Sequence, residues 1–441
     1  MSEDIMTRPA TPQLPIEVWQ LVMDTVRRAT NYETFYSDHV NYRSWALVSR
    51  AWGTCAQTVL FHTTELLDKE RLHRFIALLD DAPHLAPYVK TLRLYSRHMH
   101  TIDNVFGLLP LIPKDRLPNL TSILLTRITE QDTWHPQVWD SPSSEEHAYM
   151  PLPDILHFPS QLATHFPSVS QLYLSYVTFQ TFSDLTRVLD AFANLRVLSC
   201  LDVRWCELGA LPECLAGTEV FLPKLEDLTI LYMGLHGVER LLSALGRSSS
   251  LKELYVDCPH YHPFTIWTNP PTSADPATGT PLGIDLRPFS HLAVLWLALP
   301  YTRAVCRDLP DIVTSLLRTW DPTKVSVERR KLILTPSYES DFTRKEFADL
   351  LRVLGPIVED VLCPDCTKNK GNGDMGEEGP QSEVGVAIEV CVVDKQAKYE
   401  WWRAEACTGF TRARGRLEVN FEKSLQLQRS GRRHTGKTMT I

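Results

Sequence analysis

The stretch that decides the fold of this chain is Phe192–Cys200, which reads FANLRVLSC. Leu195, Leu198 and Cys200 in it have the spacing apolar-x-x-apolar-x-apolar. Side chains on a β-strand alternate between its two faces, so the last two of these residues point to the same side. The stretch therefore predicts a short strand with one buried face.

The same spacing occurs seven times, with starts 31, 49, 26, 30, 26 and 41 residues apart. Several copies share a lead-in, as in LPNL, FPSV, FANL, LPKL and FSHL. Helix-like stretches such as SDLTRVLDAFA and GVERLLSALGR lie between copies, and proline-rich insertions fill the two long gaps. The seven copies are Val89/Leu92/Leu94, Leu120/Ile123/Leu125, Val169/Leu172/Leu174, Leu195/Leu198/Cys200, Leu225/Leu228/Ile230, Leu251/Leu254/Val256 and Leu292/Leu295/Leu297.

A strand and a helix every 26–31 residues resemble a leucine-rich repeat. One such unit cannot bury its own apolar face, whereas stacked units bury a shared core. Right-handed crossovers then align the strands in one parallel sheet. The predicted fold class is α/β, a solenoid with a curved parallel sheet lined by helices. We expect eighth and ninth units near Lys324–Thr335 and Phe347–Leu362.

Three helices are predicted before the repeats. The first begins at Pro15, a residue that suits the first helical position. The second, WALVSRAWGTCAQTVLFH from Trp45, is expected to end in a short strand around Val59–His62, and the third covers residues 69–79. One apolar face of the first helix comprises Val18, Trp19, Val22, Met23 and Val26.

The stretches LPIEVWQLV (Leu14–Val22) and ALVSRAW (Ala46–Trp52) together resemble the F-box, a small helical module of cullin–RING ubiquitin ligases. That family's pattern opens with Leu-Pro-x-Glu-Ile/Val and closes with Leu-x-Cys/Ser-Arg/Lys-x-Trp. With the repeats that follow, the chain resembles the large fungal set of F-box proteins. The resemblance implies docking on the Skp adaptor and, through it, on a cullin. The residues implied to form or support the adaptor face are Leu14, Pro15, Val18, Trp19, Val22, Leu47, Val48 and Trp52.

Physical chemistry favours a partner site here independently of the resemblance. A helix pair with two tryptophans cannot bury all its large apolar groups within about 50 residues. The surplus is expected to form an exposed patch, and such patches mark partner sites. The alternative is an ordinary helical cap that shields the first repeat.

The other predicted surface is the concave face of the sheet, which carries the strand positions that point away from the core. Aromatic and acidic residues there suit a protein partner with a basic or mixed surface. A solvated sheet that binds nothing is the alternative. The candidate contacts to this unknown protein substrate are Arg93, Gln171, Tyr173, Asp227, Thr229, Glu253, Tyr255, Asp257 and Trp296.

Two cysteine-containing clusters are weak candidates for a metal site. Cys363 and Cys366 form a lone C-x-x-C, and the fold would have to bring in Cys391 and Cys407 to complete four ligands. The second cluster, CPHYHP at Cys258–Pro263, is read as a loop. We predict no metal and no cofactor.

The stretch GRRHTGKT near the C-terminus fits the phosphate-loop pattern through Gly431, Gly436, Lys437 and Thr438. A working phosphate loop needs a helix directly after it, and only three residues follow Thr438. We therefore expect a flexible basic tail. No catalytic motif occurs elsewhere, so the chain is predicted not to be an enzyme.

Composition sets the remaining expectations. The net charge of -8 argues against nucleic acid as a partner, and no apolar run approaches the ~20 residues that span a membrane. Scattered cysteines and the polar N-terminus favour the cytoplasm or nucleus. The predicted parts are a disordered lead-in (1–13), an F-box (14–62), a linker helix and loop (63–88), the solenoid (89–362) and a partly disordered tail with candidate capping strands (363–441).

The predicted function is the substrate-receptor subunit of a Skp–cullin–F-box ubiquitin ligase. The alternative is a non-catalytic repeat scaffold whose F-box-like helices serve structure or a non-ligase partner.

Overall fold

The structure of the chain is a computed structural model. It describes residues 15, 17–18, 21–23, 25, 42–47, 50–96, 106–127, 158–207, 221–246, 250–257, 284–299, 309–321, 325–326, 330–336, 344–362, 386–392, 399–410, 417–421 and 437–440.

The fold is α/β and is built on one large sheet. Within the described residues twelve strands pair in the order β1-β2-β3-β4-β6-β8-β9-β10-β11-β12-β13-β14. All neighbours are parallel except the last pair, β13 and β14. The strands are β1 Thr63–Leu66, β2 Thr91–Ser96, β3 Ser122–Arg127, β4 Gln171–Ser175, β6 Val197–Leu201, β8 Asp227–Leu231, β9 Glu253–Asp257, β10 Val294–Leu299, β11 Lys331–Pro336, β12 Ala387–Val392, β13 Leu417–Phe421 and β14 Lys437–Thr440.

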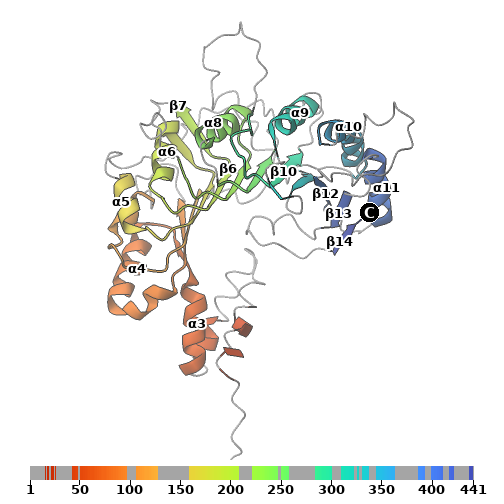
Figure 1. Cartoon of the computed structure of the whole chain (residues 1–441). Helices are drawn as coiled ribbons and strands as arrows, with labels where there is room; N and C mark the ends of the chain where they lie inside the picture. Colours follow the sequence, from red (N-terminus) through yellow and green to blue (C-terminus); the bar gives the residue numbers. More distant parts are fainter. Residues whose placement is uncertain are drawn as a thin grey trace, which may run out of the picture.

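Figure 1 shows the helices along the outer side of an arc and the strands along its inner side. A small two-stranded parallel sheet, β5 (Thr178–Thr181) with β7 (Arg204–Glu207), lies beside the main one. None of the described helices is long and apolar enough to cross a lipid bilayer. The helices are α3 Arg50–His62, α4 Lys69–Asp81, α5 Phe158–His165, α6 Phe182–Asp190, α8 Leu235–Leu245, α9 Leu309–Thr319, α10 Arg344–Leu362 and α11 Tyr399–Gly409, with 3-10 turns η1 Pro83–Tyr88 and η2 Phe106–Leu111.

All seven predicted strands are confirmed, as β2, β3, β4, β6, β8, β9 and β10. The eighth predicted unit contains β11. In the predicted ninth unit, residues 347–362 belong to helix α10, and the strand that follows is β12. The strand expected at Val59–His62 also lies elsewhere: α3 continues to His62 and β1 begins at Thr63.

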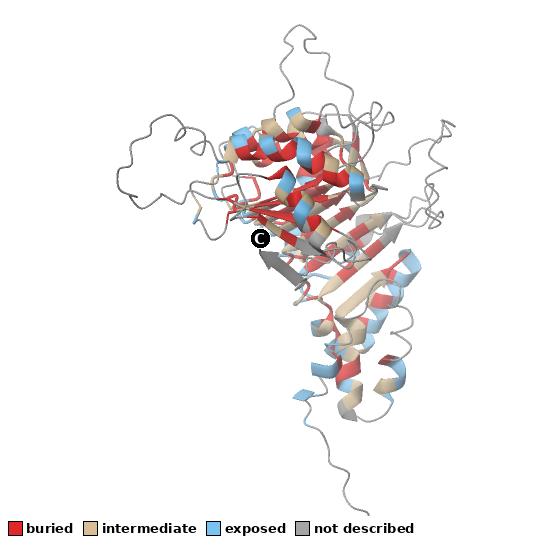
Figure 2. Ribbon diagram, turned by 90° about the vertical axis from the view of Figure 1, so that its right-hand side faces the viewer, coloured by how far each residue is buried: buried red, intermediate tan, exposed pale blue. Residues whose placement is uncertain are grey.

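The core lies between the sheet and its helices, where Figure 2 shows the buried residues. Register aligns the strand leucines into rows: Leu198 of β6 pairs with Leu172 of β4 and with Leu228 of β8. These rows form one apolar cluster with residues such as Leu185 of α6 and Leu241 of α8. Each strand thus buries one face against the helix layer, as the alternation predicts.

The lead-in before each strand is a tight turn that repeats along the chain. Its last N–H donates to its first carbonyl at 2.9–3.2 Å in all five quoted lead-ins, as in Leu195 to Phe192. A polar side chain inside the turn then donates to the backbone of the preceding unit. Asn119 donates to the carbonyl of Pro87 at 2.9 Å, and Asn194 to that of Pro167 at 2.8 Å. These bonds connect successive units at the N-terminal ends of the strands.

A second repeated turn lies where the chain leaves the sheet. Tyr176, Asp202 and Tyr232 directly follow β4, β6 and β8, with φ angles of 56°, 50° and 54°. The N–H of Tyr176 donates to the carbonyl of Leu201 at 2.7 Å, and that of Asp202 to Leu231 at 2.8 Å. This left-handed conformation is uncommon for residues other than glycine, so the apolar spacing did not predict it.

Both flanks of the predicted solenoid belong to the same sheet. Residues 63–88, expected to be a linker, supply β1, which pairs with β2, together with α4 and η1. In the predicted tail, β12 and β13 continue the parallel sheet and α11 packs against α10. The segment expected to be disordered, 368–383, and the predicted lead-in 1–13 lie outside the described residues.

Candidate protein-interaction surfaces

The N-terminal helices have a small core of their own. Met23, 1% exposed, packs there with Cys55 and Ala56 of α3. Trp45 and Trp52 are partly buried against this cluster and lie edge to face, with ring centroids 6.0 Å apart. Aromatic pairs in this arrangement stabilise a packed cluster beyond the area that they bury.

The other side of the first helix exposes large apolar side chains. Val18 and Val22 are 38% and 42% exposed, and Leu21 is 66% exposed. Positions i, i+3 and i+4 lie on one helix face, so these three share an apolar face turned to solvent. Leu47, in the turn before α3, is 88% exposed. We call these four residues the N-terminal apolar face.

Of the five residues predicted to share one apolar helix face, three are described. Met23 is buried, whereas Val18 and Val22 are exposed. Pro15 and Leu47 are exposed, and Trp52 is half-buried in the small core. Sequence reasoning missed Leu21, although its position three residues after Val18 could have identified it. The candidates Leu14, Trp19 and Val48 lie outside the described residues.

Three rows of side chains run across the strands on the face that the helices leave open. The central row contains five aligned positions from β4 to β10, and the candidates Tyr173, Thr229, Tyr255 and Trp296 belong to it. Its full course is Glu65, Arg93, Leu124, Tyr173, Ser199, Thr229, Tyr255, Trp296, Ile333, Glu389 and Glu418. Sequence reasoning did not name Ser199, which occupies the same position in its strand.

An acidic row lies beside the central row. Gln171, Val197, Asp227 and Glu253 are aligned at the first positions of β4, β6, β8 and β9. The candidate Asp257 belongs to the third row and is only 3% exposed, so it is not a surface residue as predicted.

The partly exposed aromatic side chains have defined neighbours. Tyr255 and Trp296, paired on β9 and β10, stack with ring centroids 5.9 Å apart. The Tyr173 hydroxyl donates to the Gln171 side chain at 3.4 Å. Burial raises the pKa of Tyr173, and the nearby charge of Asp227 raises it further. Asp227 lies two strands away, at the first position of β8.

Ion pairs occupy both ends of the central row. At the first end, Arg93 pairs with Glu65 of β1 at 3.3 Å. At the other, Lys331 of β11 pairs with Glu389 of β12 and lies 3.6 Å from Glu418 of β13. Arg93 is therefore separated from the aromatic positions by Leu124, and the candidate list does not form one continuous site.

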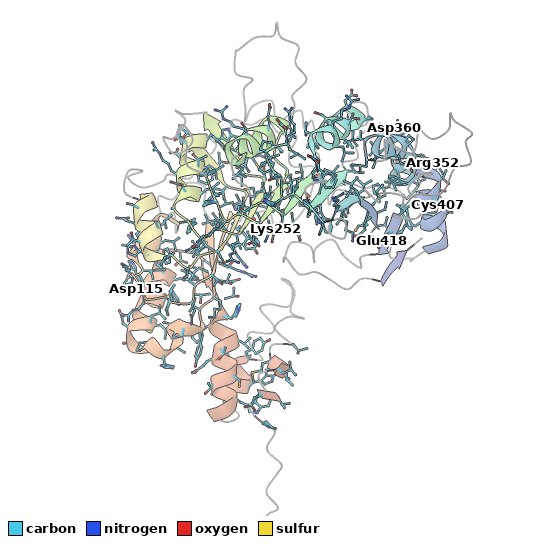
Figure 3. All side chains as sticks on the ribbon, in the orientation of Figure 1. Asp115, Lys252, Arg352, Asp360, Cys407 and Glu418 are labelled. Atoms are coloured by element: carbon cyan, nitrogen blue, oxygen red, sulfur yellow. The ribbon has the colours of Figure 1, made fainter. Side chains whose placement is uncertain are left out.

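The cysteine and tail motifs do not converge on a site. No group of three potential metal ligands occurs in the part of the chain that the structure describes. Cys391 is buried in β12, and Figure 3 shows Cys407 on α11. Burial raises the pKa of the Cys200 thiol to about 12, so it is not a nucleophile near neutral pH. Cys258, His260, His262, Cys363 and Cys366 lie outside the described residues.

Lys437 and Thr438 of the phosphate-loop match lie in an edge strand. Lys437 pairs with Phe421 and Thr438 with Asn420, antiparallel to β13. The expectation of a flexible tail is therefore wrong over residues 437–440. A phosphate loop needs these residues at the start of a helix, and a strand does not present converging N–H groups in that way.

Comparisons with other proteins add no assignment. No protein-family model matches the chain, and no curated protein matches it.

Proposed function

We propose that this chain is an F-box protein whose strand–helix units form a leucine-rich-repeat solenoid, and that it is the substrate-receptor subunit of a Skp–cullin–F-box ubiquitin ligase. The observation that carries the proposal is the N-terminal apolar face. Val18, Leu21, Val22 and Leu47 remain exposed beside the small packed core of Met23, Cys55 and Ala56. Three of them lie within the two motif halves at positions that the F-box resemblance assigns to adaptor docking.

The exposed groups have the character of a docking site. Transfer of apolar side chains out of water is the main driving force of association. Full burial of one exposed Val or Leu contributes about 1.5–3 kcal/mol, so burying the exposed parts of these four side chains would contribute several kcal/mol to a complex. An apolar face of this kind on a small helical module is typical of a partner site.

The join between this module and the sheet suits a receptor subunit. Helix α3 ends at His62 and β1 begins at Thr63, with no intervening loop. Helix α3 also contacts η1, which precedes β2. A rigid join would hold a target on the sheet at a set distance from the adaptor. The target lysine would then experience a high local concentration of activated ubiquitin, and this chain would supply no catalytic group. The proposed setting is the cytoplasm or nucleus.

Adaptor binding tests the proposal directly. The full chain and a Val18→Glu/Val22→Glu/Leu47→Glu variant would be titrated against purified Skp adaptor. All three substitutions are at exposed positions, so the fold should survive, as circular dichroism would verify. A matched control is Leu111→Glu/Val353→Glu, which changes exposed apolar residues far from the module.

The parent and the control should bind the adaptor, and the triple variant should lose at least about 100-fold in affinity, because charges would be buried in an apolar contact. A folded parent that does not bind the adaptor would contradict the proposal. It would favour the alternative of a non-catalytic scaffold whose N-terminal helices cap the first unit.

A further inference from the structure

Part of the central row has aromatic side chains at both ends and small side chains between them, and we call this stretch the trough. Tyr173 stands at one side and the Tyr255–Trp296 stack at the other, with Ser199 and Thr229 between them. Neighbouring strands lie about 4.8 Å apart, so the three steps from β4 to β9 separate the two tyrosine Cα positions by about 14 Å. Ser199 and Thr229 have shorter side chains than the aromatic residues, so the side-chain layer is thinner in the middle of this span. All five residues are partly exposed.

The trough has defined ends. Beyond Trp296 the next central-row residue, Ile333, is 3% exposed and therefore covered. Beyond Tyr173 lie Leu124 and then Arg93, which is paired with Glu65. The accessible stretch from β4 to β10 spans four strand steps, or about 19 Å. An extended peptide of roughly six residues covers that length.

The charge of the trough is negative. Over β4, β6, β8 and β9 the partly exposed positions of the three rows contain Asp227 and Glu253 and no Lys or Arg. Among the described residues, Arg196 and Lys252 directly precede β6 and β9 and pair with Glu226. The carboxylates of Asp227 and Glu253 favour a cationic ligand over an acidic or phosphorylated segment.

The opposite border offers less surface. In the third row, on the side of the central row away from Asp227 and Glu253, Leu201 and Asp257 are buried and Leu231 is partly exposed. A ligand lying along the trough would thus meet carboxylates on one side and the Leu231 side chain on the other. An extended segment with basic and apolar side chains matches both borders.

We propose that this trough binds an extended basic segment of the target protein, with an Arg or Lys side chain lying on the face of Tyr173 or of the Tyr255–Trp296 stack and its charge facing Asp227 and Glu253. Cations are attracted to the faces of aromatic rings, and Arg also stacks on them. Only one part of this inference rests on the proposed function, namely that the bound segment belongs to a ubiquitylation target. The binding itself needs no adaptor.

The test uses the full chain and fluorescein-labelled octapeptides in fluorescence anisotropy. The probes are a peptide of alternating Arg and Leu and its counterpart with Glu in place of Arg. We expect the basic peptide to bind at least tenfold more tightly than the acidic one, with weaker binding as salt rises. Equal binding of the two peptides, tighter binding of the acidic one, or no binding of either by the folded chain at about 1 mM would overturn the proposal.

Two variants locate the site. Asp227→Asn/Glu253→Gln should weaken basic-peptide binding at least tenfold, whereas Asp311→Asn/Glu239→Gln, the same charge change on the helices, should leave it within about twofold. Ser199→Arg places a cation in the trough without removing a packed group and should also weaken binding tenfold. Equal effects of the trough and helix variants would refute the location.

Adaptor binding separates this inference from the proposed function. Trough variants that lose the peptide should still bind the Skp adaptor, because the N-terminal apolar face is unchanged. Peptide binding without adaptor binding would leave the trough intact and refute only the ligase proposal. Adaptor binding with no preference for the basic peptide would refute only the trough.

Discussion

Lys331 holds two carboxylates together on the open face of the sheet, and its replacement has a predictable cost. Glu389 and Glu418 are directly paired on β12 and β13. Lys331 forms an ion pair with Glu389, whose side chain is 4% exposed, and lies 3.6 Å from Glu418, whose side chain is 27% exposed. Figure 3 shows Glu418 at the C-terminal end of the arc.

The perturbation is Lys331→Met, which keeps the length of the side chain and removes its charge. Glu389 would then be a buried carboxylate without its cation, opposite a second carboxylate on the next strand. Breaking a buried pair in this way costs about 3–5 kcal/mol. Because Lys331 is about one-third exposed, we expect the lower end, roughly 3 kcal/mol. Lys331→Met/Glu389→Met should lie within about 1 kcal/mol of the parent, since apolar replacement of both partners is often neutral.

Urea unfolding of the parent, the two single variants Lys331→Met and Glu389→Met, and the double variant gives the free energies. Repeat arrays need not unfold as one unit, so amide hydrogen exchange in Ile388–Val392 provides the local free energy as a second readout. The reasoning would be refuted if Lys331→Met cost less than about 1 kcal/mol, or if the double variant lost the sum of both single losses.

Lys331 is also expected to make the stability of the chain depend on pH. Burial lowers the pKa of Lys331, but its hydrogen bond to Glu389 and the charges of Glu389 and Glu418 outweigh burial and raise the pKa above the ordinary 10.5. The stability that it contributes is therefore fully present below pH 10.5 and is lost as the pH rises through the raised value. The parent should lose stability in that range more steeply than Lys331→Met, as urea midpoints at several pH values would show.

Three further predictions concern separate sites. Gly355→Ala should destabilise the contact between α10 and α11 by about 1–3 kcal/mol, because the added Cβ would lie 2.0 Å from the Gly409 carbonyl oxygen. Thermal unfolding measures the loss, and an unchanged midpoint would contradict it. Asp115→Gly should stabilise the chain by roughly 0.5–1 kcal/mol in the same assay, because Asp115 has a φ of 63° in an exposed turn, whereas Asp115→Ala should not. Asp227→Asn should lower the raised pKa of Tyr173 but leave it above the ordinary value, because burial is the larger cause. Phenolate absorbance titration of the chain with and without Tyr173→Phe measures this pKa, and an unchanged value would contradict an effect of the Asp227 charge.

Much of the fold could be predicted because its signals are local. The spacing of Leu195, Leu198 and Cys200 specifies a strand with one apolar face, and its recurrence specifies parallel neighbours. The same alternation placed Tyr255 and Trp296 correctly on the open face. The left-handed turns after β4, β6 and β8 carry Tyr and Asp instead of glycine, so no residue type in the sequence indicated them.

The candidate surfaces were predictable only in part, because exposure depends on what packs from elsewhere in the chain. Val18, Val22 and Met23 read as one helix face, yet Met23 alone packs against Cys55 and the others stay in solvent. Asp257 alternates outward like Tyr255 but is buried.

The sequence by itself determined the repeating strands, their buried faces and the apolar surplus at the N-terminus, since each follows from periodicity within a few residues. Only the tertiary structure decided that residues 63–66 begin the sheet and that Lys437–Thr440 end it. It also decided that Lys331 meets Glu389 and Glu418. These contacts join residues distant in the chain through strand register, and register is set by the packing of whole units against one another.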